Sequence, residues 1–99
     1  MPPSNISSLS ASSKNVELEA SIIQRFEPRL VNTRYGQSRV MNTIIEDSTG
    51  NILLTIWGDD IDKVQEGSRI KVKKAYASEW NNRMQINIGR FGKLIILNN

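Results

Sequence analysis

The segment Asp47–Gly58, D-S-T-G-N-I-L-L-T-I-W-G, decides the fold. Its first five residues hydrogen-bond locally or tolerate positive φ, which is typical of a turn. The β-branched and aromatic run over 52–57 then predicts a strand entered through a hairpin. Alternation assigns Ile52, Leu54 and Ile56 to one face and Leu53, Thr55 and Trp57 to the other. The second face combines a large aromatic with a polar Thr, which makes Trp57 a candidate binding residue.

The composition bounds the chemistry. The 99 residues suffice for one domain with one core. The chain has no cysteine and no histidine, which excludes disulfides, His-dependent catalytic triads and the usual zinc sites. The longest apolar run, Leu94–Leu97, is far shorter than the ~20 residues of a membrane span, and the Ser-rich start does not resemble a secretion signal. We expect a soluble intracellular protein that uses no cofactor and no metal.

Charge is distributed unevenly along the chain. The net charge of +3 is uninformative as a total. Residues 46–66 contain six acidic residues and one basic residue, Lys63. From residue 67 onward there are seven basic residues and one acidic residue, Glu79. The C-terminal third is therefore a basic lobe.

Periodicity predicts five strands. Residues 1–14 are expected to be mostly flexible, with Ile6 and Leu9 anchored on the domain formed by 15–99. A long first strand begins at Val16 and bends or bulges near Ile23. Residues 27–38 are predicted to be a loop, and 39–46 the second strand, with an ambiguous register. The third strand is 52–57, the fourth 68–77 and the fifth 84–89, after which 90–93 are expected to turn the chain.

A short helical segment is predicted over 59–67, between the third and fourth strands. It starts with aspartates and ends at Gly67, a pattern typical of a capped helix. A metal cluster of the three aspartates is the less favoured interpretation. Five short strands with one helical insertion and no βαβ rhythm indicate an all-β, five-stranded OB-fold barrel rather than a sandwich.

The chain has only six aromatic residues, and four of them lie in its second half. Trp57, Tyr76 and the loop residue Trp80 are expected to converge on one side of the barrel, near cations of the same strands. Aromatic platforms interleaved with cations suit single-stranded nucleic acid, because bases stack and phosphates are negative. The candidate backbone or base-edge contacts are Arg34, Tyr35, Lys71, Lys73, Arg83, Gln85, Asn87 and Arg90. The alternative is that Trp57 and Tyr76 are partly buried core residues and that the lysines form a solvated strand face.

Two stretches resemble a known family. Together with D-S-T-G-N-I-L-L-T-I-W-G, the stretch E-G-S-R-I-K-V-K-K-A-Y-A-S-E-W-N-N-R-M-Q-I-N-I-G-R-F-G-K-L over 66–94 is similar to the archaeal single-OB-fold proteins that bind single-stranded DNA. Their eukaryotic relatives are the OB-fold subunit of the sensor of single-stranded DNA complex and the OB domains of replication protein A. The resemblance implies that Trp57, Tyr76 and Trp80 stack on bases. Asn87 stands where some relatives have another aromatic.

We therefore expect a monomer that binds single-stranded DNA with little sequence preference and protects it in replication, recombination or repair, together with replication or repair proteins as partners. An RNA-binding OB-fold is one alternative, because sequence does not separate DNA from RNA here. A structural OB-fold that binds a protein partner is another. No enzymatic activity is expected, since no pair of carboxylates lies in an apolar setting.

Overall fold

The computed structural model describes residues 5–80 and 82–97, and of residues 80 and 89–91 only the backbone. The strands are β1 (Val16–Arg25), β2 (Arg29–Thr33), β3 (Gly36–Asp47), β4 (Gly50–Trp57), β5 (Arg69–Trp80) and β6 (Arg83–Ile96). Two 3-10 turns accompany them, η1 (Ile6–Ser8) and η2 (Gly58–Lys63). The predicted flexibility of residues 1–4 lies outside the described residues.

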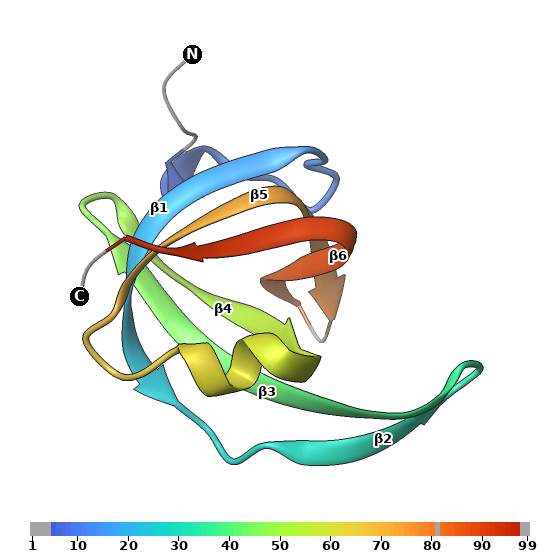
Figure 1. The fold of residues 1–99 in the computed structure, drawn as a ribbon. Helices are drawn as coiled ribbons and strands as arrows, with labels where there is room; N and C mark the ends of the chain where they lie inside the picture. Colours follow the sequence, from blue (N-terminus) through green and yellow to red (C-terminus); the bar gives the residue numbers. More distant parts are fainter. Residues whose placement is uncertain (1–4, 81, 98–99) are drawn as a thin grey trace.

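Five of the strands close into a ring (Figure 1). The hydrogen-bonded order is β1-β5-β6-β4-β3, and β3 pairs again with β1. All neighbours are antiparallel except β4 and β6, which run parallel over Leu53–Thr55 and Gln85–Asn87. β2 lies outside the ring and pairs with β3 only. The prediction of an all-β OB-fold is thus confirmed.

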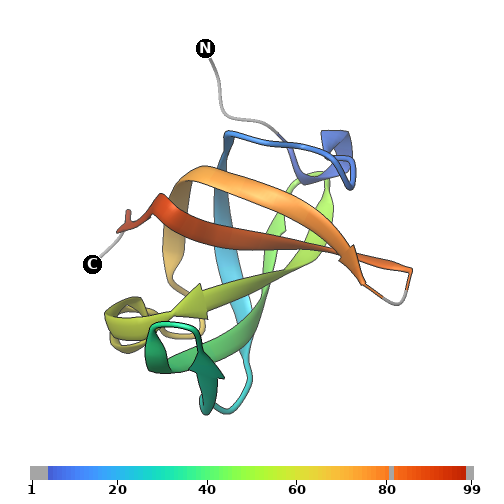
Figure 2. The ribbon, with the colours of Figure 1, turned by 90° about the vertical axis from the view of Figure 1, so that its right-hand side faces the viewer.

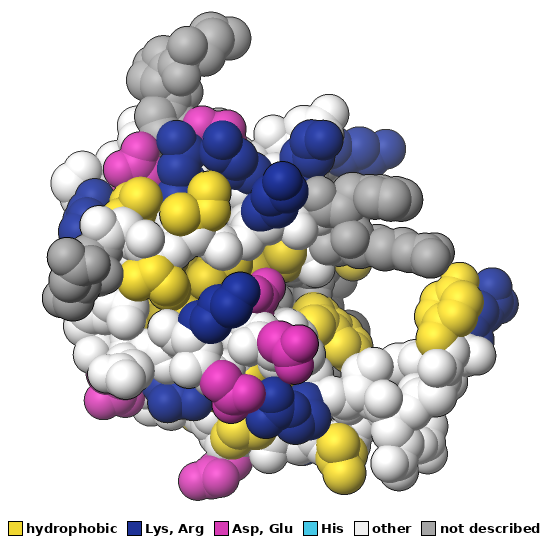
Figure 3. Space-filling view, in the orientation of Figure 1, with side chains coloured by type: hydrophobic (Ala, Val, Ile, Leu, Met, Phe, Trp, Pro, Cys, Tyr) yellow, Lys and Arg dark blue, Asp and Glu magenta, His cyan; other side chains and the backbone are white. Residues whose placement is uncertain are grey.

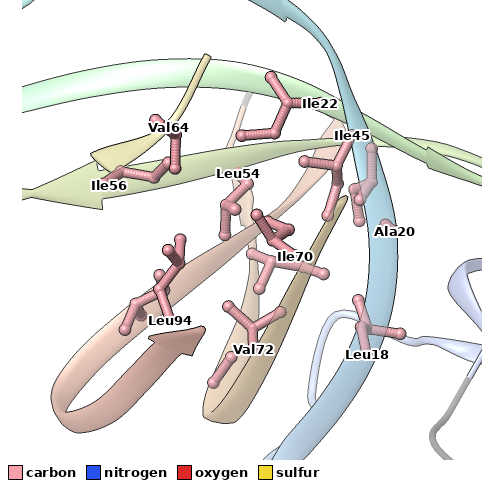
Figure 4. Packing of buried hydrophobic residues seen from close by; sticks show 14 of the residues in the cluster. Leu18, Ala20, Ile22, Ile45, Leu54, Ile56, Val64, Ile70, Val72 and Leu94 are labelled. Atoms are coloured by element: carbon pink, nitrogen blue, oxygen red, sulfur yellow. The ribbon is translucent and has the colours of Figure 1, made fainter. Parts of the chain in front are cut away.

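The core fills the inside of the ring. The alternating residues Ile52, Leu54 and Ile56 are buried there, as predicted for the strand after the Asp47 turn. Side chains from β1, β3, β5 and β6 point toward them, and Val64 from the segment after η2 joins the cluster (Figure 4). Since one face of each strand is apolar and buried, hydrophobic burial fixes the register of the ring.

The segment between the first two predicted strands is not a loop, and that prediction is wrong. Residues 29–33 and 36–47 form an antiparallel ribbon that turns at Arg34 and Tyr35. Gly36 adopts φ 110 at this turn, a conformation that side chains disfavour. The ribbon projects away from the ring (Figure 1). It escaped prediction because neither face of β2 is apolar enough to be buried.

Other elements are longer or shorter than expected. The bulge in β1 is confirmed between Ile22 and Gln24. β5 extends to Trp80, which was predicted to lie in a loop. Residues 90–93, where a turn was expected, belong to β6, but the pairing of β6 with β5 jumps from Ile88 to Lys93 there. The predicted helical segment is the single 3-10 turn η2, and no aspartate side chain caps it. Instead, Asp62 pairs with Arg39 at 2.9 Å and Asp60 with Lys63 at 3.3 Å.

The N-terminal segment is attached to the ring by two apolar residues. Ile6 is only 5% exposed and belongs to the core cluster, and Leu9 packs against it. The backbone N–H groups of Ile6 and of Ser7 donate to Asp47 and Thr49 in the β3–β4 turn. η1 therefore lies beside that turn, at one end of β4.

Candidate nucleic-acid interface

A groove crosses the outer face of β3, β4 and β6, between the β2–β3 ribbon and the β5–β6 hairpin. Figure 2 shows the ribbon and the hairpin projecting on opposite sides of this face. In Figure 3 the molecule is hollowed beside the ribbon. The volume of the groove is about 1260 Å³. This exceeds the ~300–1,000 Å³ of small-molecule pockets, so the groove suits an extended ligand.

Cross-strand register aligns the side chains of the groove floor. Asn42 lies opposite Thr55, Thr55 beside Asn87, and Asn87 opposite Tyr76. Residues paired in this way share a face, so a polar row crosses the sheet and ends in an aromatic. The Thr55 hydroxyl donates to Asn42 Oδ1 at 3.2 Å, which holds the centre of the row in place.

A second row marks the end of the groove near the β2–β3 ribbon. Trp57 is the last residue of β4 and lies opposite Val40, which in turn lies opposite Arg29 on β2. The Trp57 side chain is 39% exposed. The exposed aromatic on β4 and the arginine on β2, with Val40 of β3 between them, provide a stacking surface and a positive charge in one row.

Arg39 ties this end of the groove to η2. Its guanidinium donates to the Asp62 carboxylate, and a second bond of 3.4 Å reaches the carbonyl of Gly58, the residue after Trp57. The hydrogen bond and the charge of Arg39 lower the pKa of Asp62, and Asp62 raises the pKa of Arg39 in return. This cation is thus already paired.

The β5–β6 hairpin supplies the opposite wall. Tyr76 is 44% exposed at the end of the polar row. Ser78 Oγ accepts a hydrogen bond from Asn87 Nδ2 at 3.1 Å and one from Gln85 Nε2 at 3.4 Å, so both predicted amides are oriented by one hydroxyl. The backbone of Trp80 pairs with Arg83, and the Trp80 side chain lies outside the described part of the structure.

The charge of the groove is positive. Among the described residues that line it, the charged ones are Arg29 and Arg83, and none is a carboxylate. The remaining lining residues are polar or apolar. A groove whose described lining has two guanidinium groups and no carboxylate attracts a polyanion.

The structure brings only some of the predicted site residues to this groove. Trp57, Arg83, Gln85 and Asn87 line it, and Tyr76 borders it. Arg34 and Tyr35 form the tip of the ribbon, where Tyr35 is 80% exposed. Lys71 and Lys73 are not among the lining residues, and Lys71 pairs with Glu17 at 3.5 Å. The side chain of Arg90 is outside the described residues.

Sequence reasoning missed the contribution of β2 and β3. Arg29, Val31 and Thr33 line the groove from β2, and Asn42 lies at its centre. The signal for β2 was the pair of β-branched residues, Val31 and Thr33, before the Tyr35-Gly36 turn. Asn42 was not predicted as a groove residue because the register of the second predicted strand was ambiguous.

Two features are absent from residues 5–80 and 82–97: a cluster of acidic side chains that could hold a metal ion, and a helix that could cross a membrane. No group of three or more acidic side chains there is close enough to hold a metal ion. No helix in that part of the chain is long and apolar enough to cross a membrane.

Comparison with known proteins finds a family match over most of the chain. Residues 6–96 match the family described as single-stranded DNA binding protein Ssb-like, OB fold. A curated relative, the single-stranded DNA binding protein Ssb of Saccharolobus solfataricus, is 25% identical over 89 residues. The match covers 90% of this chain and 60% of the relative's length.

Solved structures share the fold. An OB domain from Thermoplasma acidophilum superimposes with a TM-score of 0.83 at 18% identity, over 97% of this chain and 87% of that one. A chain of a replication protein A heterotrimer bound to single-stranded DNA gives a TM-score of 0.74 at 18% identity. That alignment covers 97% of this chain and 25% of the other.

Proposed function

The chain belongs to the Ssb-like, OB-fold family of single-stranded DNA-binding proteins, and on this basis we propose that its groove binds single-stranded DNA with little sequence specificity. One observation carries the proposal. The groove combines exposed aromatic side chains at its ends with two arginines and no carboxylate among its described lining. Stacking platforms in a positive channel are what a single strand requires.

Trp57 and Tyr76 stack on bases in this proposal. They lie in different rows of the sheet, with Thr55 and Asn87 between them, so two bases can be held apart on one face. Each stacked base contributes about 1–3 kcal/mol. Trp80, at the tip of the β5–β6 hairpin, is proposed as a third platform on the basis of the family resemblance.

Arg29 and Arg83 neutralise phosphates on opposite walls. Arg34 and Tyr35 reach over the strand from the tip of the ribbon, and Arg90 adds positive charge on β6. Gln85 and Asn87 meet the base edges, since Ser78 already orients their amides. Amide groups donate and accept, so they accommodate several bases rather than selecting one.

The proposed role is protection of single-stranded DNA in replication, recombination or repair, inside the cell. The similar replication protein A chain belongs to a heterotrimer, which supports a search for replication or repair partners. The chain itself is proposed to bind as a monomer. RNA is the nearest competing ligand, and competition between oligothymidylate and oligouridylate for the same groove separates the two.

The proposal is tested by fluorescence anisotropy with a labelled oligothymidylate. Trp57→Ala is expected to weaken binding about 5–150-fold, the loss of one stacked base. Leu30→Ala is the matched control, because Leu30 is an exposed large side chain of β2 that does not line the groove. Equal affinities of Trp57→Ala and the wild-type protein would contradict the proposal. Wild-type protein that binds no oligonucleotide would favour a structural OB-fold with a protein partner.

A further inference from the structure

A second cationic surface lies on β5 and β6, outside the groove. Lys73 on β5 lies directly opposite Lys93 on β6, so the two side chains share the outer face. Lys74 follows at a register shift and is exposed. Figure 3 shows Lys and Arg side chains gathered over the part of the molecule where Figure 1 places β1 and β5. We call Lys73, Lys74 and Lys93 the lysine track.

The lysine track takes part in no ion pair of the residues that the structure describes. The ion pairs of the described residues involve Arg39, Lys63 and Lys71, and no lysine of the track takes part in them. Glu17, an acid on the adjacent strand β1, is engaged by Lys71 instead. Like charges directly opposite each other in an antiparallel pair destabilise the sheet. The Lys73–Lys93 pairing therefore contributes nothing favourable to folding without an anion.

The lysine track lies close to the groove along β5. Tyr76, at the groove edge, follows Lys73 by three residues on the same strand, at most about 10 Å away at ~3.3 Å per residue. Between the pairs Lys73–Lys93 and Ala75–Ile88, Lys74 with φ 56 is left unpaired on β5, and residues 89–92 are left unpaired on β6. An irregularity of this kind bends the strand, here between the groove and the track.

We propose that the lysine track carries the phosphate backbone of the same DNA strand after it leaves the groove past Tyr76. This inference rests on the proposed function. The track consists of three ammonium groups, which suit phosphates. Short oligonucleotides fill the groove alone, and longer ones also reach the track.

The test compares oligothymidylates of increasing length, from about 4 to 16 nucleotides, the range that OB-folds occupy. The affinity of each is measured at several salt concentrations for the wild-type protein and for Lys73→Gln/Lys93→Gln. We expect equal affinities for the shortest oligonucleotides that bind. For the longest, the slope of log K against log salt should fall by about 1.4, or ~0.7 for each lost phosphate contact.

The matched single variants are Lys93→Gln and Lys63→Gln, which change the net charge equally. Lys63 lies on η2 and pairs with Asp60, away from the track. Only Lys93→Gln should lower the slope, and only for long oligonucleotides. Neither glutamine variant of the track should lower folding stability, since each removes a like-charge pair.

The outcomes separate the two proposals. Three results would overturn the proposal for the lysine track and leave groove binding intact. The track variants could lower the salt slope equally at every oligonucleotide length, Lys63→Gln could lower it as much as Lys93→Gln, or the slope for long oligonucleotides could stay unchanged. Failure of the wild-type protein to bind an oligonucleotide of any length would overturn both.

Discussion

The backbone N–H of Ile6 donates a hydrogen bond of 2.9 Å to Asp47 Oδ2, across 41 residues of sequence. The other carboxylate oxygen accepts the N–H groups of Thr49 and Gly50 and the Thr49 hydroxyl. One side chain thus shapes the β3–β4 turn and holds the N-terminal segment at the end of the groove. Partial burial opposes ionisation of Asp47, but these hydrogen bonds outweigh it and lower its pKa.

Asp47→Asn should reduce the acid sensitivity of the fold. Because the pKa of Asp47 is lowered in the folded state, its stabilising effect is fully present above the ordinary value of 3.8. It is lost as the pH falls through the folded pKa. Urea unfolding of the wild-type protein should show a drop in stability from pH 6 to pH 3, and a smaller drop in the variant. Asp59→Asn changes the charge equally and makes none of these bonds, so an identical response of both variants would contradict this role.

Arg29→Gln tests the contribution of β2 to binding. Arg29 lies next to Val40 and hence near Trp57, and it is one of two charged residues among the described lining of the groove. Loss of one phosphate contact should lower the slope of log K against log salt by about 0.7. The measurement is an anisotropy titration at several salt concentrations, with Lys63→Gln as the charge-matched control. An unchanged slope in Arg29→Gln would place the phosphates elsewhere.

Two substitutions of Tyr76 distinguish base stacking by its ring from hydrogen bonding by its hydroxyl. Tyr76→Phe keeps the ring and should retain most of the affinity for oligothymidylate, whereas Tyr76→Ala should lose about 5–150-fold. Calorimetric titration of the two variants provides the comparison. If Tyr76→Phe weakened binding as much as Tyr76→Ala, the hydroxyl rather than the ring would be the group that binds the oligonucleotide.

Neighbouring leucines of β4 should differ sharply in their effect on stability. Leu54 is fully buried in the core, so Leu54→Ala should lower the free energy of unfolding by about 2–5 kcal/mol. Leu53 faces the groove and is only partly buried, so Leu53→Ala should cost clearly less. Chemical denaturation of both variants checks the alternation that defines the strand. Similar losses in the two variants would mean that both faces of β4 are core.

Sequence predicted the parts of the fold in which one face of a strand is apolar. β4 is the best case, since the alternation of Ile52, Leu54 and Ile56 describes its buried face correctly. β2 has no buried face, because it pairs with β3 alone outside the ring, and periodicity therefore had nothing to detect. The end of β5 was missed because hairpin pairing with Arg83 extends the strand through polar residues.

The candidate site was predictable in its aromatics and not in its lysines. Trp57 follows from alternation, whereas strict alternation with Ile70 and Val72 would bury Tyr76, which the register shift at Lys74 turns outward. Both aromatics are exposed beside the groove. Lys71 and Lys73 were grouped with them because they share a strand. However, β5 shifts register at Lys74, and the residues before the shift pair with β1 and the end of β6. Lys74 adopts φ 56 without being Gly or Asn, so its own residue type did not mark the bulge on β5.

The most direct measurement of the central claim uses Trp80→Phe, in which Trp57 is the single tryptophan. Its emission is followed during titration with oligothymidylate at low and at high salt. Base stacking in a positive groove predicts strong quenching of Trp57 and an affinity that falls as salt rises. If the oligonucleotide binds by anisotropy while the Trp57 emission stays unchanged, the groove is not where the bases lie.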